Sequence, residues 1–211
     1  MLARQVERIS RSKKIDKLIV ATSTHLSDNP VEELCNELSV PCFRGELNDV
    51  LSRFYFASLQ SKSEYIVRLT GDCPLTDPEI IDSVINYHIK GGFEYTSNSI
   101  IPTFPDGLDV EVMNKSVLRL VYENAKLTSE REHVTLFINN NKESYKIGSY
   151  ENKVDLSSNR WTVDEKEDLD FVKTIYSALY KECPDFSTKD ILKYLEKNPE
   201  ISNINSCFER N

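Results

Sequence analysis

The sequence lacks any apolar stretch close to the ~20 residues that a helix needs to cross a bilayer. Its first residues also lack the basic-then-apolar order of a secretory signal. Basic residues are fewer than acidic ones. The chain has 26 Lys and Arg residues and 34 Asp and Glu residues, which gives a net charge of −8. An acidic chain is a poor match for nucleic acid or for an anionic membrane surface. We therefore expect a cytoplasmic protein without either partner, although arginines and backbone N–H groups can still bind phosphates locally.

Cysteine chemistry has little support in the sequence. The five cysteines are an odd number and contain no Cys-x-x-Cys pair, which argues against a disulfide framework and against a zinc site. We interpret them as reduced thiols. No Ser–His or Cys–His pattern indicates a protein nucleophile, and nothing near Cys73 looks like a base that would activate it. Without internal repeats or low-complexity linkers, the 211 residues are expected to form a single domain, 1–211.

Helix and strand patterns alternate along nearly the whole chain, which predicts an α/β fold with a mostly parallel sheet covered by helices on both faces. Apolar runs and alternating patterns predict strands at 17–22, 40–43, 65–69, 93–96, 108–113, 145–150 and 160–163. Helical spacing predicts helices at 2–12, 29–38, 49–60, 77–90, 114–126, 129–140, 165–181 and 187–197. The segment 97–105 is expected to be a polar loop, and the tail from 198 to be frayed or loosely docked.

The most informative run is Arg-Leu-Thr-Gly-Asp-Cys-Pro-Leu-Thr-Asp-Pro, from Arg68 to Pro78. Asp72 lies on a glycine turn directly after the strand at 65–69, and the next helix begins with Asp77 as its N-cap and Pro78 in its first turn. Ligands of open α/β sheets bind at the carboxyl ends of the strands. Asp72 is therefore the first candidate for a Mg²⁺ ligand, and a turn aspartate that bonds its own backbone is the alternative.

Asp164 is the second candidate carboxylate. It follows the strand at 160–163 and precedes the helix at 165–181, with Glu167 three residues on. This spacing predicts a helix-capping arrangement in which Asp164 caps the helix. Capping is compatible with metal binding, because one carboxylate oxygen can cap while the other faces a cation.

Other polar residues suggest a sugar-binding side. Asp109 and Glu111 lie on the same face of the strand at 108–113, where they can hold sugar hydroxyls or a cation, or form a solvated strand face. His133 could reach a substrate anion, but a lone histidine near a helix start is more often structural. Ser129 and Glu132 next to it are expected to form a capping box. Arg68 can meet a phosphate, or form an ordinary buried ion pair.

Five motifs in order resemble one family. They are Phe43-Arg44-Gly45 with Asp49-Val50-Leu51-Ser52-Arg53-Phe54, the run from Arg68 to Pro78, Gly107-Leu-Asp-Val-Glu111, Arg131-Glu-His-Val-Thr135 and Arg160-Trp-Thr-Val-Asp164. Together they resemble the cytidylyltransferases of spore coat polysaccharide biosynthesis, which are related to the acylneuraminate and KDO cytidylyltransferases. The resemblance covers nearly the whole chain. It implies the nucleotide-diphospho-sugar transferase fold, a Rossmann-like three-layer α/β/α arrangement.

The resemblance also implies a reaction and a site. The reaction is CTP plus a sugar, typically a 2-keto sugar acid, giving CMP-sugar and pyrophosphate for surface or spore-coat polysaccharide. Mg²⁺ is expected on Asp72 and Asp164, with Asp72 and Arg68 as the catalytic pair. The residues expected to line the substrates are Arg44, Asp109, Glu111 and His133. Relatives often dimerise, so a homodimer is expected as well.

The same resemblance predicts a gap in the sheet. Relatives begin with a strand and a loop of the type Ala-Arg-x-x-Ser-x-Arg-Leu-Pro-Gly-Lys that holds the triphosphate, whereas Met1-Leu2 matches an internal Met-Leu of the family. That strand would lie in mid-sheet, ~4.8 Å from each neighbour. Losing roughly four or five buried aliphatic side chains at ~2 kcal/mol each forfeits on the order of 10 kcal/mol. We therefore expect either a longer true chain or a remnant.

Two other functions stay open at this point. A glycosyltransferase on a similar fold would transfer a sugar without releasing pyrophosphate. A non-catalytic remnant would bind a partner, or nothing, because the phosphate-binding loop is not present in these residues.

Overall fold

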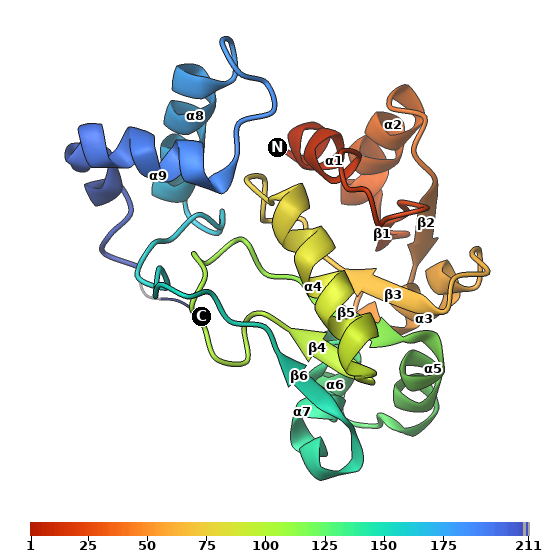
Figure 1. The fold of residues 1–211 in the computed structure, drawn as a ribbon. Helices are drawn as coiled ribbons and strands as arrows, with labels where there is room; N and C mark the ends of the chain where they lie inside the picture. Colours follow the sequence, from red (N-terminus) through yellow and green to blue (C-terminus); the bar gives the residue numbers. More distant parts are fainter. Residues whose placement is uncertain (209, 211) are drawn as a thin grey trace.

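The computed structural model describes residues 1–208 and 210 and shows two β-sheets surrounded by helices (Figure 1). β1 (Val20–Ser23) and β2 (Cys42–Gly45) form a parallel pair. The second sheet has the order β3-β5-β4-β6, and its strands are Tyr65–Arg68, Glu111–Asn114, Tyr95–Ser97 and Ile147–Ser149. β5 runs antiparallel to both neighbours, whereas β4 and β6 are parallel. The predicted α/β class is confirmed, and the larger sheet is mixed around β5.

Helices cover both sheets and extend into a separate helical layer. Figure 1 shows α8 and α9 together at the end of the molecule away from β6, beyond the N-terminal end of α4. The helices in chain order are α1 Leu2–Ile9, α2 Asn29–Glu37, α3 Val50–Ser58, α4 Pro78–Gly91, α5 Lys115–Asn124, α6 Thr128–Glu132, α7 Leu136–Asn140, α8 Lys166–Leu179 and α9 Thr188–Lys197. Short 3₁₀ turns lie at Leu26–Asp28, Lys142–Ser144 and Pro199–Asn203. In the described residues, no helix is long and apolar enough to cross a membrane.

Local signals set the ends of α4 as predicted. The Asp77 carboxylate accepts a hydrogen bond from the backbone N–H of Glu79 (2.8 Å), and Pro78 occupies the first turn. Gly92 ends the helix in the left-handed conformation with φ 57°, which glycine adopts without steric cost. One face of α4, with Ile81, Val84 and Ile85, is buried against β5 in a core cluster.

The segment 129–140 differs from its prediction, because two short helices replace the single expected one. His133 between them has φ −99° and ψ 86°, which is not helical. Val134 and Ile138 are both buried in one core cluster and keep helical spacing across the break, so the sequence pattern conceals it. The predicted capping box is also wrong. Glu130, not Glu132, accepts from the backbone at the start of α6, since the helix begins at Thr128.

Several strands are shifted or shortened relative to the expected ranges. β1 and β2 each begin two or three residues later than predicted, and β5 begins only at Glu111. The expected strand at 160–163 is reduced to an isolated parallel bridge between Asp106 and Arg160. Apolar patterning marks buried segments, but the strand itself exists only where a partner backbone supplies the hydrogen bonds.

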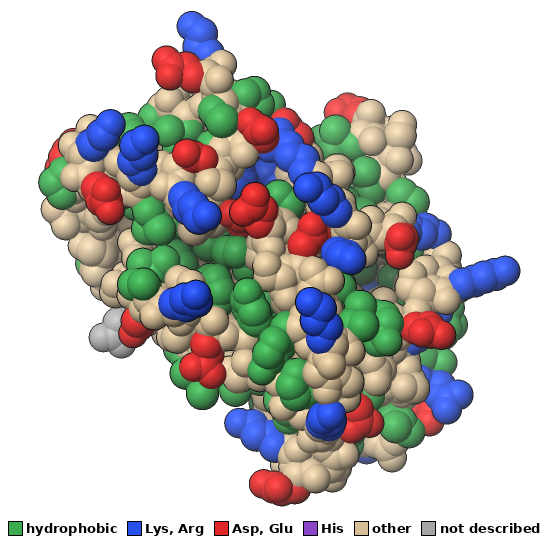
Figure 2. All heavy atoms as spheres, in the orientation of Figure 1, with side chains coloured by type: hydrophobic (Ala, Val, Ile, Leu, Met, Phe, Trp, Pro, Cys, Tyr) green, Lys and Arg blue, Asp and Glu red, His purple; other side chains and the backbone are tan. Residues whose placement is uncertain are grey.

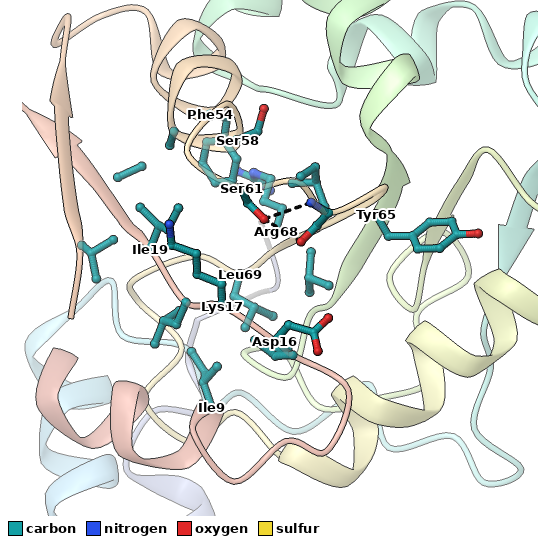
Figure 3. A pocket seen from close by; sticks show the side chains of 18 of the residues that line it. Ile9, Asp16, Lys17, Ile19, Phe54, Ser58, Ser61, Tyr65, Arg68 and Leu69 are labelled. Atoms are coloured by element: carbon teal, nitrogen blue, oxygen red, sulfur yellow. Dashed lines mark hydrogen bonds between the residues drawn. The ribbon is translucent and has the colours of Figure 1, made fainter. Parts of the chain in front are cut away.

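The two sheets do not pair with each other within the described residues. β1 pairs through one edge with β2, and β3 pairs through one edge with β5, which leaves one edge of each strand open. Between them lies a cavity of ≈ 570 Å³, lined by β1, β3 and the inner faces of α1, α3 and α4. Figure 3 shows Ile9, Ile19, Phe54 and Leu69 around it. The gap that the resemblance predicted in the sheet is therefore confirmed.

Charged side chains of both signs are interspersed over the face of the molecule shown in Figure 2. Some form local pairs on α1, where Glu7 pairs with both Arg4 (2.8 Å) and Arg11 (2.7 Å). Exposed pairs of this kind contribute only about 0–1 kcal/mol each. The stability of the fold therefore depends on its core clusters and on the buried polar networks described below.

We expect the protein to lose stability below about pH 6.5, the ordinary pKa of histidine, because of His88. This residue of α4 is fully buried, with its ring nitrogens hydrogen-bonded to Thr96 Oγ1 (2.9 Å) and Asn114 Oδ1 (3.1 Å). Burial lowers its pKa. The unfolded chain therefore binds the proton more readily than the folded one, so stability present above the unfolded pKa is lost as the pH falls. Thermal unfolding at pH 7.5 and pH 5.5 measures the loss.

The comparison variant is His88→Gln, which cannot take up a proton and should show a smaller loss between the two pH values. His25→Gln is the matched control, because His25 is exposed. Identical pH dependence in the wild type and His88→Gln would contradict this assignment.

Candidate active site

The Gly71-Asp72 turn lies beside the segment that carries Asp164. The backbone N–H of Val163 donates to the Asp72 carbonyl oxygen (2.9 Å), and the Thr162 hydroxyl approaches the same oxygen (3.5 Å). In the described residues, Asp72 Oδ1 accepts from the Cys73 thiol (3.3 Å) rather than from its own backbone. The structure thus brings the two predicted metal-binding carboxylates onto adjacent segments, although they are 92 positions apart in the sequence.

A tight turn at 105–107 docks on the same segment. The Asp106 N–H donates to the Asn159 carbonyl (2.9 Å), and the Trp161 N–H donates to the Asp106 carbonyl (2.7 Å). Gly107 has φ 99°, and a Cβ atom there would lie 2.5 Å from the backbone nitrogen of Thr162. This close approach requires glycine. Three segments, 70–73, 104–111 and 159–164, therefore meet at one place.

Replacing Gly107 by alanine is expected to destabilise the protein by on the order of 3 kcal/mol, because it adds backbone strain and a clash with backbone atoms that cannot rotate away. Gly71→Ala is the matched control, since a Cβ there meets nothing within 4 Å. Urea unfolding of both variants gives the comparison. Equal stabilities would show that the 105–107 turn does not depend on its contact with the 160–163 segment.

The buried guanidinium of Arg160 connects several carboxylates of the site. Its Nε and one terminal nitrogen donate to the two oxygens of Asp168 (3.0 Å each), and the same terminal nitrogen donates to Asp164 Oδ2 (2.9 Å). Its other terminal nitrogen lies 3.4 Å from Asp106 Oδ2. Burial alone would raise the pKa of Asp168, but hydrogen bonds from Arg160 and Asn205 hold it below its ordinary value. Arg160 therefore links three carboxylates, one from the 105–107 turn and two from the start of α8.

The predicted capping of α8 by Asp164 is wrong by one residue. The N-cap is Glu165, and the helix is capped by Asp168, whose Oδ2 accepts from the backbone N–H groups of Asp164 (3.1 Å) and Glu165 (3.0 Å). Sequence spacing alone cannot distinguish these registers, because both place an acidic residue three positions into the helix. Among the described residues, the Asp164 side chain does not cap α8 and instead accepts a hydrogen bond from Arg160 (2.9 Å).

The side chains of Asp109 and Glu111 lie in different environments and have different partners. Glu111 is buried, forms an ion pair with Arg68 and accepts a hydrogen bond from the Tyr95 hydroxyl (2.5 Å). Asp109 instead bonds Arg210 Nη2 through Oδ1 (2.6 Å). Arg68 and Glu111 are direct partners in the β3–β5 register, so the buried ion pair is the arrangement that the structure shows for Arg68.

Asn98 fixes the position of Asp109. No sign of this role for Asn98 is present in the sequence. It is fully buried inside the segment expected to be a polar loop. Its side-chain amide donates to the Leu108 carbonyl (2.8 Å), and its Oδ1 accepts from the Val110 N–H (2.7 Å). The Asn98 side chain thus hydrogen-bonds backbone groups on both sides of Asp109, where regular β4–β5 pairing has ended.

Two of the expected substrate-binding residues lie elsewhere. Arg44, on β2, donates to the carbonyls of Ser23 (2.8 Å) and His25 (2.9 Å) and to Glu32 (2.7 Å). His133 is exposed at the end of α6. Among the described residues, no hydrogen bond or ion pair joins either of them to Asp72. Their roles in substrate binding stay predictions.

The electrostatic environment of the site is acidic. Burial raises the pKa of Asp106, with Asp164 and Asp72 adding to the rise and Arg210 and Arg160 opposing it. Burial also raises the pKa of Asp109, against the pull of Arg210. Cys73 beside Asp72 has its pKa raised well above the ordinary value, chiefly by burial, so its thiol stays protonated and is not a nucleophile.

Two carboxylates would suit a metal ion shared with water and substrate phosphates better than one held entirely by protein. In the described residues, no group of three or more His, Cys, Asp or Glu side chains forms a ready metal cluster. Mg²⁺ in nucleotide-dependent enzymes is bound by one or two carboxylates, with water and substrate phosphates completing its octahedron. Asp72 and Asp164 can supply those two carboxylates.

Comparisons with known proteins show the family of this chain. The sequence model of the family described as "Cytidylyltransferase" matches residues 1–200. The chain is 40% identical over 205 residues to an uncharacterized protein of Methanocaldococcus jannaschii, covering 95% of this chain and 82% of that protein. It is 34% identical over 204 residues to the spore coat polysaccharide biosynthesis protein SpsF of Bacillus subtilis, covering 93% and 83%.

Solved structures give the same result. A cytidylyltransferase from Leptospira borgpetersenii has a TM-score of 0.90 and 33% identity, covering 95% of this chain and 84% of that one. A CMP:2-keto-3-deoxy-manno-octonic acid synthetase complexed with CTP has a TM-score of 0.63 at 12% identity, covering 83% and 87%. The second match shows the shared fold alone.

Proposed function

The chain belongs to the cytidylyltransferase family, and from that premise we propose that it transfers CMP from CTP to a sugar, with release of pyrophosphate. The observation that carries the proposal is the docking of the Gly71-Asp72 turn against the segment of Asp164. It brings the backbone segments that carry Asp72 and Asp164 side by side after β3, and open α/β sheets bind their ligands at the carboxyl ends of their strands. The sugar is proposed to be an acidic one, and its product to serve polysaccharide biosynthesis.

The residues of the site suit a reaction that needs positioning and charge balance. Asp72 and Asp164 are proposed to hold Mg²⁺, which when bound neutralises charge on the phosphate oxygens and on the leaving pyrophosphate. Arg160 keeps Asp164 in place from the buried side. Asp109 is proposed to accept hydrogen bonds from sugar hydroxyls. The attacking group is then a hydroxyl of the sugar itself, since the protonated Cys73 offers no nucleophile.

The direct test is pyrophosphate release by the purified protein from CTP and Mg²⁺ in the presence of a panel of sugars. The panel includes 2-keto-3-deoxy-manno-octonic acid and neutral hexoses. Release that depends on both CTP and a sugar is the expected result. Sugar transfer from a nucleotide sugar without pyrophosphate would favour the glycosyltransferase alternative.

Binding of CTP distinguishes an enzyme from a remnant. Titration calorimetry of the 211-residue protein with CTP and Mg²⁺ is expected to show micromolar affinity for CTP, which would contradict the remnant alternative. No binding, together with no pyrophosphate release, would favour the non-catalytic alternative for this chain.

A further inference from the structure

Near the C-terminus, the described residues Asn205 and Arg210 contact residues of the candidate site. Asn205 is almost completely buried, and its amide donates to the Arg160 carbonyl (2.9 Å) and to Asp168 Oδ1 (2.8 Å). The Phe208 ring lies 5.8 Å from the Arg160 guanidinium. The expectation of a frayed or loosely docked tail is therefore wrong at Asn205, because its amide replaces water as a partner of two buried acceptors.

Arg210 joins the two ends of the turn that carries Asp106 and Gly107. One terminal nitrogen donates to the Phe104 carbonyl (3.2 Å), and the other donates to Asp109 Oδ1 (2.6 Å). Its Nε lies 3.9 Å from Asp106 Oδ1. A planar guanidinium can make these contacts at once because its five N–H donors point in fixed, divergent directions.

Two side chains, Asn98 and Arg210, thus hold Asp109 in position. Asn98 fixes the backbone around it, and Arg210 fixes its carboxylate. Without a cation, the Asp109 carboxylate would face Asp106 and Glu111, which both oppose its ionisation. The family match ends at residue 200, so this cation comes from outside the matched segment.

We propose that Arg210 is a positioning residue of the sugar-binding side, which acts by holding the 104–109 turn and the carboxylate of Asp109. Its kinetic consequence rests on the proposed function. Loss of Arg210 loosens the turn and weakens binding of the sugar, while CTP binding on the Asp72 side is unchanged.

Hydrogen–deuterium exchange tests the positioning role without any need for activity. In Arg210→Gln, backbone amides of 104–110 are expected to exchange about tenfold faster than in the wild type, because a charge-assisted hydrogen bond to the turn is lost. Amides of β1 and β2 should be unchanged. Ser206→Ala is the matched control in the same tail, since Ser206 is exposed and only weakly bonded to the Asn203 carbonyl (3.3 Å). Unchanged exchange at 104–110 overturns the proposal.

Kinetics test its consequence for the reaction. Arg210→Gln is expected to raise the KM for the sugar about tenfold, with the KM for CTP within about twofold of the wild type. Arg210→Lys should recover only part of the loss, because lysine keeps the charge but cannot reach both acceptors. A rise in both KM values, or in neither, contradicts the proposal. If the wild-type protein releases no pyrophosphate, the proposed function fails, and the exchange experiment alone decides the role of Arg210.

Discussion

Replacing Arg160 by alanine is expected to reduce the free energy of unfolding by about 3–5 kcal/mol, because it leaves the buried Asp168 carboxylate without its cation. Asp168 has no solvent exposure and bonds Arg160 through both oxygens, at 3.0 Å each. A buried charge without a partner keeps its desolvation cost and loses the attraction that offsets it. Such a loss is a large share of the ~5–15 kcal/mol that stabilise a typical domain.

Urea unfolding with a surface control measures this effect. Arg119→Ala removes an exposed guanidinium whose partner Glu123 is 3.8 Å away, and it should change stability by less than about 1 kcal/mol. Replacing both buried partners, Arg160→Met with Asp168→Leu, should recover part of the loss, because no unpaired charge remains at the fully buried position 168. Recovery is incomplete, since the two backbone N–H groups at the start of α8 also lose their acceptor. If Arg160→Ala is no more harmful than the control, the buried network does not stabilise the fold.

Replacing Asp72 by asparagine is expected to lower the rate of pyrophosphate release by on the order of 10²-fold or more, because several kcal/mol of charge stabilisation depend on a metal-binding carboxylate. The substitution preserves shape. The Asp72 carbonyl, which bonds Val163, belongs to the backbone and is retained. Stability should therefore change little while activity falls, and the two effects are measured on the same preparation.

Asp170→Asn is the control for Asp72→Asn, because Asp170 is a half-exposed carboxylate on the outer side of α8, 3.7 Å from Lys173. It should retain wild-type turnover. Titration with Mg²⁺ gives a second measurement, since the loss of one ligand should raise the Mg²⁺ concentration needed for half-maximal rate. Near wild-type turnover in Asp72→Asn would exclude Asp72 as a metal ligand and would leave the family assignment unaffected.

Much of the site was predictable because it depends on short-range signals. A strand of apolar residues that ends in Thr70-Gly71-Asp72 and precedes an Asp77-Pro78 helix start has few possible local structures. The motifs at Asp109 and Asp164 were recognised as part of the same site for a different reason, since they occur in a known order along the chain. Their meeting in space is an outcome of folding, through the bond from Val163 to Asp72 and the turn at Gly107.

Other predictions failed where a shift of one or two residues decides which side chain caps a helix, or where a facing strand decides which charges pair. Asp168 caps α8 in place of Asp164, and Glu130 caps α6 in place of Glu132. At α8 neighbouring acidic residues satisfy the same sequence pattern, whereas at α6 the N-cap is Leu127, a residue type that the capping-box pattern does not include. Glu111 and Asp109, which alternation places on one face, separate because regular pairing of β5 begins at Glu111 and pairs it with Arg68. Register of this kind is set by the facing strand.

The sequence by itself predicted the α/β class from its apolar periodicity and turn residues, and it predicted the family and the gap beside β3 through the resemblance carried by its ordered motifs. The carboxylates of the candidate metal site stay a prediction. Only the tertiary structure decided the partners of each charge. Arg68 pairs with Glu111, Arg160 joins Asp106, Asp164 and Asp168, and Arg210 returns from the C-terminus to Asp109. Charged side chains reach partners far away in sequence, and burial makes those choices energetically decisive.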